Sequence, residues 1–253
     1  MQIVRDILET LPEGEVLDVR IGLHWIAVVM EVGGVQRCGL ASTLSGGHHH
    51  DRVEADVPQA GHLETLGSRQ LAEMALSCNL TQASIGIAAI NALLPPCPQL
   101  WFEANAEDTI AEHGQGKRVV LVGRFPFTER LRQRVNELLV LEQNPGPGDL
   151  PASAAPEVLP KADVIAITGM TFANHTLEGL LALRPPHAKV IILGPSTPLS
   201  PVLFDYGVDI LSGAVVTAIE PVLRTVSQGG DFRQVHRAGV RLVNIQRSNM
   251  NDH

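Results

Sequence analysis

Three consecutive histidines are the most metal-like feature of this 253-residue sequence. His48, His49 and His50 precede Asp51, and His62 follows nearby. In an extended segment the side chains of His48 and His50 point to the same side, so two imidazoles with Asp51 or His62 could bind zinc, nickel or copper. The spacing matches no known closed metal site, and a solvent-exposed polar loop that binds metal only adventitiously is the competing interpretation.

Glycines and small polar residues follow three apolar runs in the second half of the chain. Parallel strands present their carboxyl ends at one edge of a sheet, and ligands bind outside that edge. Glycine allows a ligand to approach the backbone closely, and the helix starts that follow offer amide groups to an anion. Ordinary turn and helix-cap chemistry explains any one of these loops. Taken together they predict a ligand site bordered by Gly123, Phe125, Thr168, Gly169, Gly194 and Ser196.

A histidine lies close to the same predicted edge. The sequence predicts a helix that begins near Asn174, with Asn174 as its cap and His175 in its first turn. The positive end of a helix lowers the pKa of a histidine and keeps it neutral, so that it can bind a metal. The competing interpretation is a partly exposed residue at a helix start.

A metabolite enzyme is the alternative class of protein. Glu142 ends the second apolar run, where an acidic residue binds a ribose diol in many dinucleotide-binding folds. With the Gly194 loop holding a cofactor and His175 as acid or base, such an enzyme would act on a small anionic or nucleoside-containing metabolite. The loop at Gly123 lacks the GxGxxG pattern, however, and no catalytic triad order, G-x-S-x-G elbow, P-loop or HExxH pattern supports a hydrolase or a nucleoside triphosphatase.

Composition narrows the list of partners. The chain carries 19 Lys and Arg against 27 Asp and Glu, and its formal net charge is −8. No basic cluster exists for nucleic acid, no apolar run approaches the roughly 18 residues needed to span a bilayer, and the N-terminus does not resemble a signal peptide. We therefore expect a cytoplasmic protein without a nucleic-acid or membrane partner. Three cysteines without CxxC spacing predict free, buried thiols, and the sequence leaves open whether the chain forms a homo-oligomer.

The first part of the chain predicts an α+β domain. Apolar residues at helical spacing between Ile3 and Leu11 predict an opening helix, and alternation with a Gly33-Gly34 turn predicts three antiparallel strands over residues 15–43. A long loop over residues 44–67 and helices over residues 68–77 and 81–94 follow. Prolines at 95, 96 and 98 place a boundary between a domain of residues 1–98 and one of residues 99–253.

The second part predicts a parallel sheet. Apolar, largely β-branched runs at residues 119–122, 138–141, 164–167, 190–193 and 208–211 alternate with helical segments. Strands that are apolar throughout are buried on both faces, so helices must cover both sides of a doubly wound, Rossmann-like sheet. Residues 144–160 are rich in proline and predict a surface loop.

Several separate segments together resemble one known family. They include residues 39–43, Asn79, residues 84–92 and 122–126, residues 163–169, Asn174, residues 176–178 and 193–198, and residues 207–209 with Gly213. In this order they are similar to the heavy-metal chelation family, which carries a DUF364 domain after a DUF4213-type N-terminal domain. The resemblance covers nearly the whole chain. It implies an N-terminal domain like that of enolase, a Rossmann-like C-terminal domain, and a site in the cleft between them.

The resemblance also implies site residues, which are Thr43, Asn79, Ser84, Asn91, Thr168, Asn174 and Ser196. Hydroxyl and amide groups suit a small polar ligand or a chelated metal better than a soft naked ion. The three histidines are not part of the family pattern. Asn79 could instead cap a helix, Asn91 could satisfy a nearby backbone group, and Gly86 inside a helix indicates either ligand approach or tight packing.

The leading hypothesis is therefore a protein that binds a divalent or heavy metal ion, or a metal chelate, between two domains.

Overall fold

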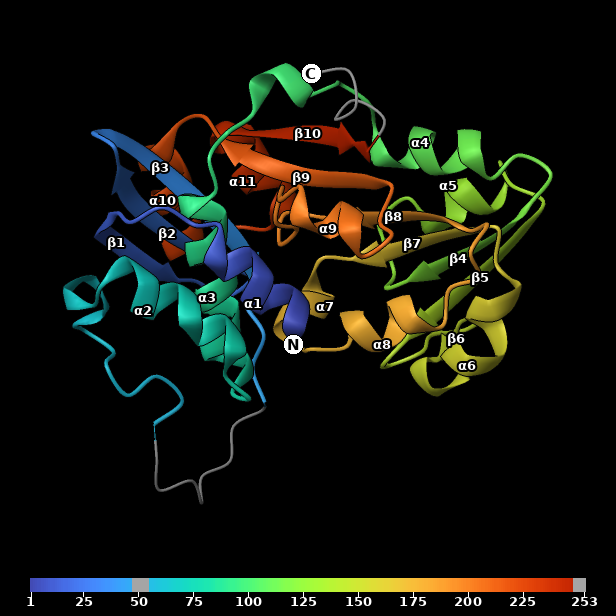
Figure 1. Cartoon of the computed structure of the whole chain (residues 1–253), viewed down its shortest axis with the longest axis horizontal. Coiled ribbons are helices and arrows are strands. Elements are labelled where there is room, and N and C mark those ends of the chain that lie inside the picture. Colours follow the sequence, from blue (N-terminus) through green and yellow to red (C-terminus); the bar gives the residue numbers. More distant parts are fainter. Residues whose placement is uncertain (47–54, 248–253) are drawn as a thin grey trace.

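The computed structural model describes residues 1–46 and 55–247, which form a mixed α/β fold with one small antiparallel sheet and one large, mostly parallel sheet (Figure 1). Within the described residues no helix is long and apolar enough to cross a membrane. The segment with His48, His49, His50 and Asp51 lies outside the described residues.

The small sheet confirms the predicted antiparallel meander. Its three strands pair in the order β1-β2-β3, and a tight turn at Gly33-Gly34 with φ of 60° and 77° joins the last two. The central strand is apolar on both sides, because five consecutive residues from Ile26 to Met30 are buried. The elements of this part are α1 (Gln2–Glu9), β1 (Glu15–Ile21), β2 (Trp25–Val32) and β3 (Val35–Ser42).

Two helices pack on one face of this sheet. They are α2 (Ser68–Glu73), which continues into a 3₁₀ turn at Met74–Leu76, and α3 (Leu80–Leu93). Helix α3 crosses β3 at Gly39, where a Cβ atom would lie 2.1 Å from the Ala88 carbonyl oxygen. A Cβ atom on Gly86 would lie 1.9 Å from the Ala75 amide nitrogen. Tight packing therefore explains Gly86, since no side chain fits between α3 and the preceding turn.

The large sheet has seven strands in the order β10-β9-β8-β7-β4-β5-β6. All neighbours pair in parallel except β9 and β10, which are antiparallel. The first four predicted apolar runs each form a strand, the last run at residues 208–211 overlaps β9 only from Ile210 onward, and the short β6 and the antiparallel β10 are additions. The strands are β4 (Arg118–Val122), β5 (Glu137–Glu142), β6 (Leu150–Pro151), β7 (Val164–Thr168), β8 (Lys189–Leu193), β9 (Ile210–Val216) and β10 (Val240–Gln246).

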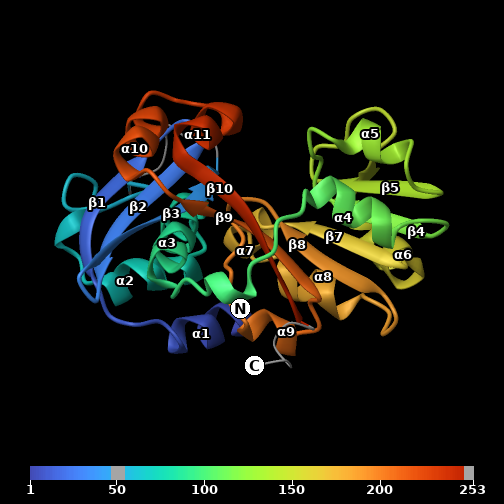
Figure 2. The same cartoon turned by 90° about the horizontal axis from the view of Figure 1, so that it is seen from above.

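Helices cover both faces of the large sheet (Figure 2). One face packs on α4 (Ala106–His113) and α5 (Thr128–Arg132), and the other on α6 (Ala155–Val158), α8 (Leu177–Ala182) and α9 (Val202–Asp205). The predicted surface loop at residues 144–160 is wrong in part, because this segment contains β6, α6 and two 3₁₀ turns at Ala152–Ala154 and Leu159–Lys161. Buried Ala155 and Leu159 anchor it to the core despite its prolines.

The C-terminal helices α10 (Ile219–Ser227) and α11 (Phe232–Gly239) leave the large sheet and cover the second face of the small one (Figure 2). Strand β9 pairs with β8 only as far as Ser212, and its remaining residues pair with β10 in a two-stranded ribbon that leads to α10. Val222 and Val226 of α10 are buried against Ala27 and Val29 of β2. The small sheet thus lies between α3 and α10.

Candidate functional site

The small sheet meets the carboxyl edge of the large sheet through a cluster of neutral polar side chains, here called the hydroxyl junction: Ser42, Ser84, Asn91 and Ser196. Ser196 follows β8 and is only 3% exposed. Its Oγ accepts a hydrogen bond from the Ser42 amide at 2.8 Å, and it contacts the Ser42 Oγ at 3.2 Å. These bonds hold the end of β3 against the loop after β8.

Helix α3 supplies the other two members. Ser84 and Asn91 are seven residues apart and therefore lie on the same face of the helix. The Ser84 Oγ accepts from the Leu44 amide at 3.3 Å. Asn91 donates to the Leu40 carbonyl at 2.9 Å and approaches the Pro195 carbonyl at 3.5 Å. Asn91 thus satisfies backbone groups on both sides of the junction.

The carboxyl edge itself is built from glycines in left-handed backbone conformations. Gly123 ends β4 with φ of 100°, and Gly194 ends β8 with φ of 110°. Gly123 lies against the Thr168 side chain at the end of β7, since a Cβ atom would be 2.9 Å from its Cγ2. Gly194 faces open space, with no atom within 4 Å of the position of a Cβ. Buried Gly169 packs on Thr197, with the Cβ position 2.6 Å from the Thr197 Oγ1.

Thr43 lies directly after the junction. Its hydroxyl donates to the Gly22 carbonyl at 2.8 Å, and the residue remains partly exposed. Thr168 is likewise partly exposed, and its Oγ1 makes only a long contact of 3.4 Å with the Met170 amide. Thr43 and Thr168 therefore retain hydrogen-bonding capacity, while the side chains of the hydroxyl junction are used within the protein.

Asn79 lies at the opposite end of α3 from the Asn91 contact. Its side chain caps α3 by accepting from the amides of Thr81 and Gln82, and its amide group donates to Asp56 at 2.9 Å. The helix-cap interpretation therefore accounts for Asn79.

The expected helix start at Asn174 is wrong. Asn174 follows the short helix α7 (Met170–Ala173), and α8 begins only at Leu177. The Asn174 Oδ1 accepts from the hydroxyl and amide of Thr176 and so stabilises the turn between the two helices. His175 occupies this turn with φ of 59°, and its Nε2 is 2.9 Å from the Ala75 carbonyl. His175 is therefore not in a helical first turn, because two short helices replace the single expected one.

Phe125 and Glu142 stabilise the loop after β4, the first by packing and the second by hydrogen bonds. The rings of Phe125 and Phe127 stack with centroids 5.2 Å apart and pack on the core between the sheet, α4 and α5. Glu142 accepts from the backbone amides of Arg124 and Gln143 at 2.5 Å and 3.1 Å. Both carboxylate oxygens of Glu142 therefore accept hydrogen bonds from the loop backbone, where a ribose diol would otherwise donate.

Charged groups near His175 are paired with each other. Burial alone would raise the pKa of Glu178, but hydrogen bonds from the N-terminal ammonium group and the Ile3 amide lower it below its usual value. These contacts join α1 to α8. None of the four side chains of the hydroxyl junction is ionisable.

Among residues 1–46 and 55–247, no three His, Cys, Asp or Glu side chains gather in a way that could hold a metal ion. The prediction that His48 and His50 bind a metal is untested, since both lie outside the described residues, and His175 has no such group around it among the residues that are described. The described donors near the junction are hydroxyls and amides. Such groups fit a complex that brings its own metal ligands better than a bare soft ion.

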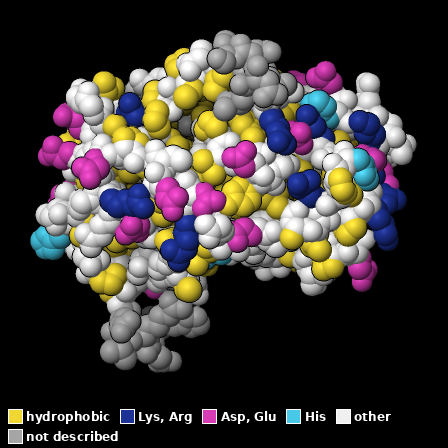
Figure 3. All heavy atoms as spheres, viewed as in Figure 1, with side chains coloured by type: hydrophobic (Ala, Val, Ile, Leu, Met, Phe, Trp, Pro, Cys, Tyr) yellow, Lys and Arg dark blue, Asp and Glu magenta, His cyan; other side chains and the backbone are white. Residues whose placement is uncertain are grey.

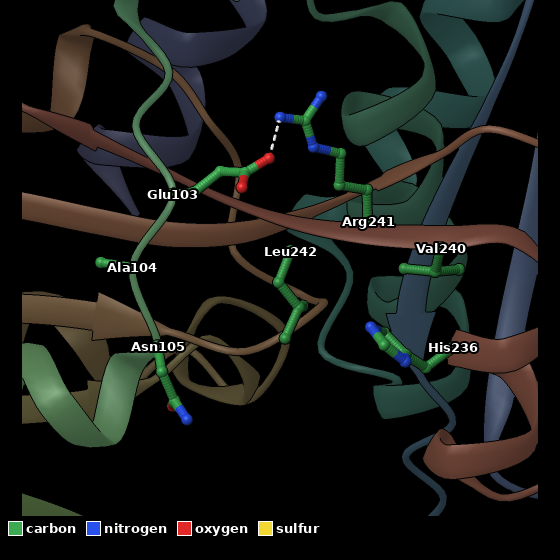
Figure 4. A pocket seen from close by; sticks show the side chains of 7 residues that line it. All are labelled: Glu103, Ala104, Asn105, His236, Val240, Arg241 and Leu242. Carbon is green, nitrogen blue, oxygen red and sulfur yellow. Dashed lines mark hydrogen bonds and ion pairs between the residues drawn. The ribbon is translucent and has the colours of Figure 1, made fainter.

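A wide hollow opens elsewhere, between the connector before α4 and the outer side of β10 (Figure 4). It measures about 490 Å³, and Arg241 reaches across it to form an ion pair with Glu103. Leu242 projects into it, and His236 borders it from α11. None of the predicted site residues lines this hollow.

Ser42 is the residue of the junction that the sequence prediction missed. It stands between Ala41 and Thr43 in a segment that the family resemblance already includes. Its role depends on Ser196, which is 154 positions away. Only the position of Ser42 at the end of a predicted strand could have drawn attention to it.

Comparison with known families places the chain in a defined class. It belongs to the DUF364 family, whose model matches residues 105–244 and is described as "Putative heavy-metal chelation". A second model with the same description, DUF4213, matches residues 4–94. The heavy-metal chelation resemblance is therefore confirmed at the level of the family.

Three similar proteins are described as uncharacterized or of unknown function. The uncharacterized protein MJ0500 of Methanocaldococcus jannaschii is 27% identical over 221 residues, covering 83% of this chain and 82% of that protein. A DUF364 protein of unknown function from Desulfitobacterium hafniense has a crystal structure that matches with a TM-score of 0.81 and 28% identity, covering 97% and 98% of the two chains. One from Pyrococcus horikoshii, at 22% identity and the same coverage, matches the fold with a TM-score of 0.80.

Proposed function

We propose that the protein binds a metal ion held in a small-molecule chelate at the carboxyl edge of the large sheet, beside the hydroxyl junction. Gly123, Thr168 and Gly194 would contact the chelate from the large sheet, and Thr43 from the small one. The family description, which names chelation of heavy metals, supports a metal-containing ligand.

The observation that carries this proposal is that some polar side chains at the edge are bonded within the protein, while others remain partly exposed. Buried Ser196 and partly buried Asn91 use their side chains to join the two sheets, and buried Ser84 holds the segment after β3 against α3. Partly exposed Thr43 and Thr168, with the open backbone at Gly194, are left to face a ligand. The bonded junction makes the site rigid, and the groups that would face the ligand are uncharged. Such a site suits a ligand in which a chelator already balances the charge of the metal.

The proposal includes the finer classification of the two halves. We assign the large sheet to the Rossmann-like class, because its strand order reverses between β4 and β7, where Gly123 meets Thr168. We assign residues 1–98 to an enolase N-terminal-like unit and residues 99–253 to the Rossmann-like one. The helices α10 and α11 would then be a C-terminal addition that serves the N-terminal unit.

Metal analysis tests the proposal. Untagged protein, purified without added metal, is compared by plasma mass spectrometry with Thr168→Val and with the variant in which His48, His49 and His50 are replaced by alanine. Thr217→Val is the matched control, because Thr217 is exposed on the ribbon away from the edge. An extract of the denatured protein is examined by liquid chromatography and mass spectrometry for an organic chelator.

We expect about one metal ion and one organic molecule per chain in the wild type, the histidine variant and Thr217→Val, and loss of both in Thr168→Val. Loss of metal from the histidine variant alone would move the site to the histidine loop and overturn the proposal. An organic ligand without metal would support the metabolite enzyme instead.

A further inference from the structure

A second cavity is lined by residues from both halves of the chain. The edge of β3 and the end of α3 border it from the first half. The connector before α4, the loop after β8 and the ribbon of β9 and β10 border it from the second half. Its volume is about 390 Å³, which is within the range of small-molecule sites. Thr43, Gly123, Thr168 and Gly194 do not line it, and only Asn91 is shared with the hydroxyl junction.

The walls of this cavity are largely apolar. The side chains that define them come from α3, the connector, the loop after β8 and the large sheet, and they include Leu94, Leu100, Trp101, Leu199, Val216 and Ile245. Trp101 offers an indole ring from the connector. Walls of this kind bind an apolar body, and the few polar groups then determine its orientation.

Arg37 is the one charged residue among those that line the cavity. Its Nη1 makes a long hydrogen bond of 3.4 Å to the Leu93 carbonyl, while its Nε is shielded from solvent and has no partner. No carboxylate of the described residues forms an ion pair with it. The Nε and Nη2 edge of a guanidinium is the fork that binds a carboxylate through two parallel hydrogen bonds. An unpaired, partly buried cation is costly, so the arrangement favours an incoming anion.

The hydroxyl of Thr197 adds a second unsatisfied group. Thr197 is 2% exposed, lines the same cavity, and its Oγ1 has no hydrogen-bond partner among the described residues. Arg37 and Thr197 come from opposite sides, since one belongs to β3 and the other to the loop after β8. A ligand between them would contact both halves of the chain.

Cys38, one of the two cysteines that line the cavity, does not favour a soft-metal site. Burial, together with the nearby Asp18 carboxylate, raises the pKa of the Cys38 thiol to about 12. The thiol therefore stays protonated near neutral pH, whereas metals bind the thiolate. This leaves the guanidinium of Arg37 as the group that selects the ligand.

We propose that this cavity binds a small carboxylate with an aromatic body, the carboxylate on Arg37 and the ring between Trp101 and the apolar walls. This site is separate from the proposed chelate site, and either can exist without the other.

The test compares two ligands of nearly equal shape and different charge. Binding of 1-naphthoate and of 1-naphthamide to the full chain is measured by isothermal titration calorimetry, with benzoate and indole-3-acetate as further carboxylates. The variants are Arg37→Met, Arg37→Lys and Arg5→Met, the last being a control at an exposed arginine of α1 that does not line the cavity.

We expect at least one of the three carboxylates to bind with one site per chain, and 1-naphthamide to bind much more weakly than 1-naphthoate. Arg37→Met should weaken carboxylate binding by about tenfold or more, because a hydrogen-bonded charge is removed. Arg37→Lys retains the charge without the fork and should give a smaller loss, which keeps the test valid if Arg37→Met fails to fold. Arg5→Met should bind as the wild type does.

The proposal is overturned if none of the three carboxylates binds saturably. It is also overturned if the acid and the amide bind equally well, or if folded Arg37→Met and Arg37→Lys both bind like the wild type.

Discussion

The two faces of the small sheet are covered in similar ways by helices from opposite ends of the chain. The face toward α3, here called the inner face, meets a helix that follows the sheet by about 40 residues in sequence. The face toward α10, here called the outer face, meets a helix that begins at Ile219. On both faces a glycine lets the backbones touch: a Cβ atom would lie 2.1 Å from the Ala88 oxygen at Gly39 and 2.2 Å from the Val226 oxygen at Gly22.

The two faces differ in how far along the chain their covering helices lie. The inner face is completed within the segment that matches the N-terminal family model, residues 4–94. The outer face is completed by residues of the C-terminal segment, including Val222, Leu223 and Val226. The small sheet therefore depends on the second half of the chain for one of its two covers, although all of its strands lie in the first half.

Removal of the second half of the chain should reduce the stability of the small sheet more than any other change, because it removes the cover of the outer face. A fragment of residues 1–98 would expose Ala27, Val29 and Leu40, which are at most 3% exposed in the whole chain. We expect the fragment to lack a cooperative thermal transition by circular dichroism, because the apolar face that α10 covers would be exposed to water. The full chain is the control. A sharp transition of the isolated fragment would show that the inner face alone stabilises the sheet.

Alanine at the two contact glycines should have the next largest effect. Gly39→Ala and Gly22→Ala force a methyl group against helix backbone, so each should lower the free energy of unfolding by about 3 kcal/mol or more, measured by urea denaturation. Gly39→Ala should cost more, since Ala88 and Ala92 both press on that position.

Gly67→Ala is the matched control for these glycines. No atom lies within 4 Å of a Cβ at this position, and its φ of −63° suits alanine. Its effect should remain within about 0.5 kcal/mol. An equally small effect of Gly22→Ala would mean that α10 does not press on the outer face.

Loss of one hydroxyl at the junction should have a smaller effect. Ser196→Ala leaves the amide of Ser42 without its partner, which should lower the free energy of unfolding by about 1 to 3 kcal/mol. Ser227→Ala, at an exposed position at the end of α10, should change it by less than about 0.5 kcal/mol. If the two variants unfold alike, the hydroxyl bonds do not contribute to the joining of the sheets.

The reactivity of Cys38 should report opening of the outer face without a large change in stability. Cys38 packs on the cluster that includes α10, and burial raises the pKa of its thiol from 9.0 to about 12. Because the folded state favours the protonated thiol, this contribution to stability is present below pH 9 and is lost as the pH rises toward 12.

At pH 8, iodoacetamide should therefore modify exposed Cys78 much faster than Cys38, as measured by peptide mass spectrometry. Leu223→Ala, which loosens α10, should accelerate the modification of Cys38 and leave that of Cys78 unchanged. Equal rates for the two cysteines in the wild type would contradict a closed outer face.

Much of the fold could be predicted because its signals are local. The buried run from Ile26 to Met30 and the first four apolar runs of the second half each form a strand, since a strand that is covered on both faces must be apolar throughout. The apolar run in β2 fits the two covers that the structure shows. It could not indicate which helix provides the second cover, because helical periodicity in α10 shows an apolar face but not its partner.

The candidate site was predictable only in its parts. Glycines after β4 and β8 and small polar residues after β7 and β8 were expected from their positions at strand ends, and the structure brings Gly123 to Thr168 and Ser196 to Ser42. Asn174 and His175 were misplaced because two short helices replace the expected one, a change that depends on the contact of His175 with Ala75. Arg37 and Thr197 gave no local signal.

The sequence by itself determined the elements, their order and the family, because apolar periodicity, glycine turns and helix caps act between neighbours in the chain. The tertiary structure alone decided that α10 closes the small sheet, that Ser42 bonds to Ser196, and that Arg37 faces an apolar cavity without a counter-charge. The first two features join residues that are about 150 or more positions apart in sequence, and the third joins Arg37 to residues from both halves of the chain. Their energies depend on burial and on the exclusion of water, which exist only once both halves have folded together.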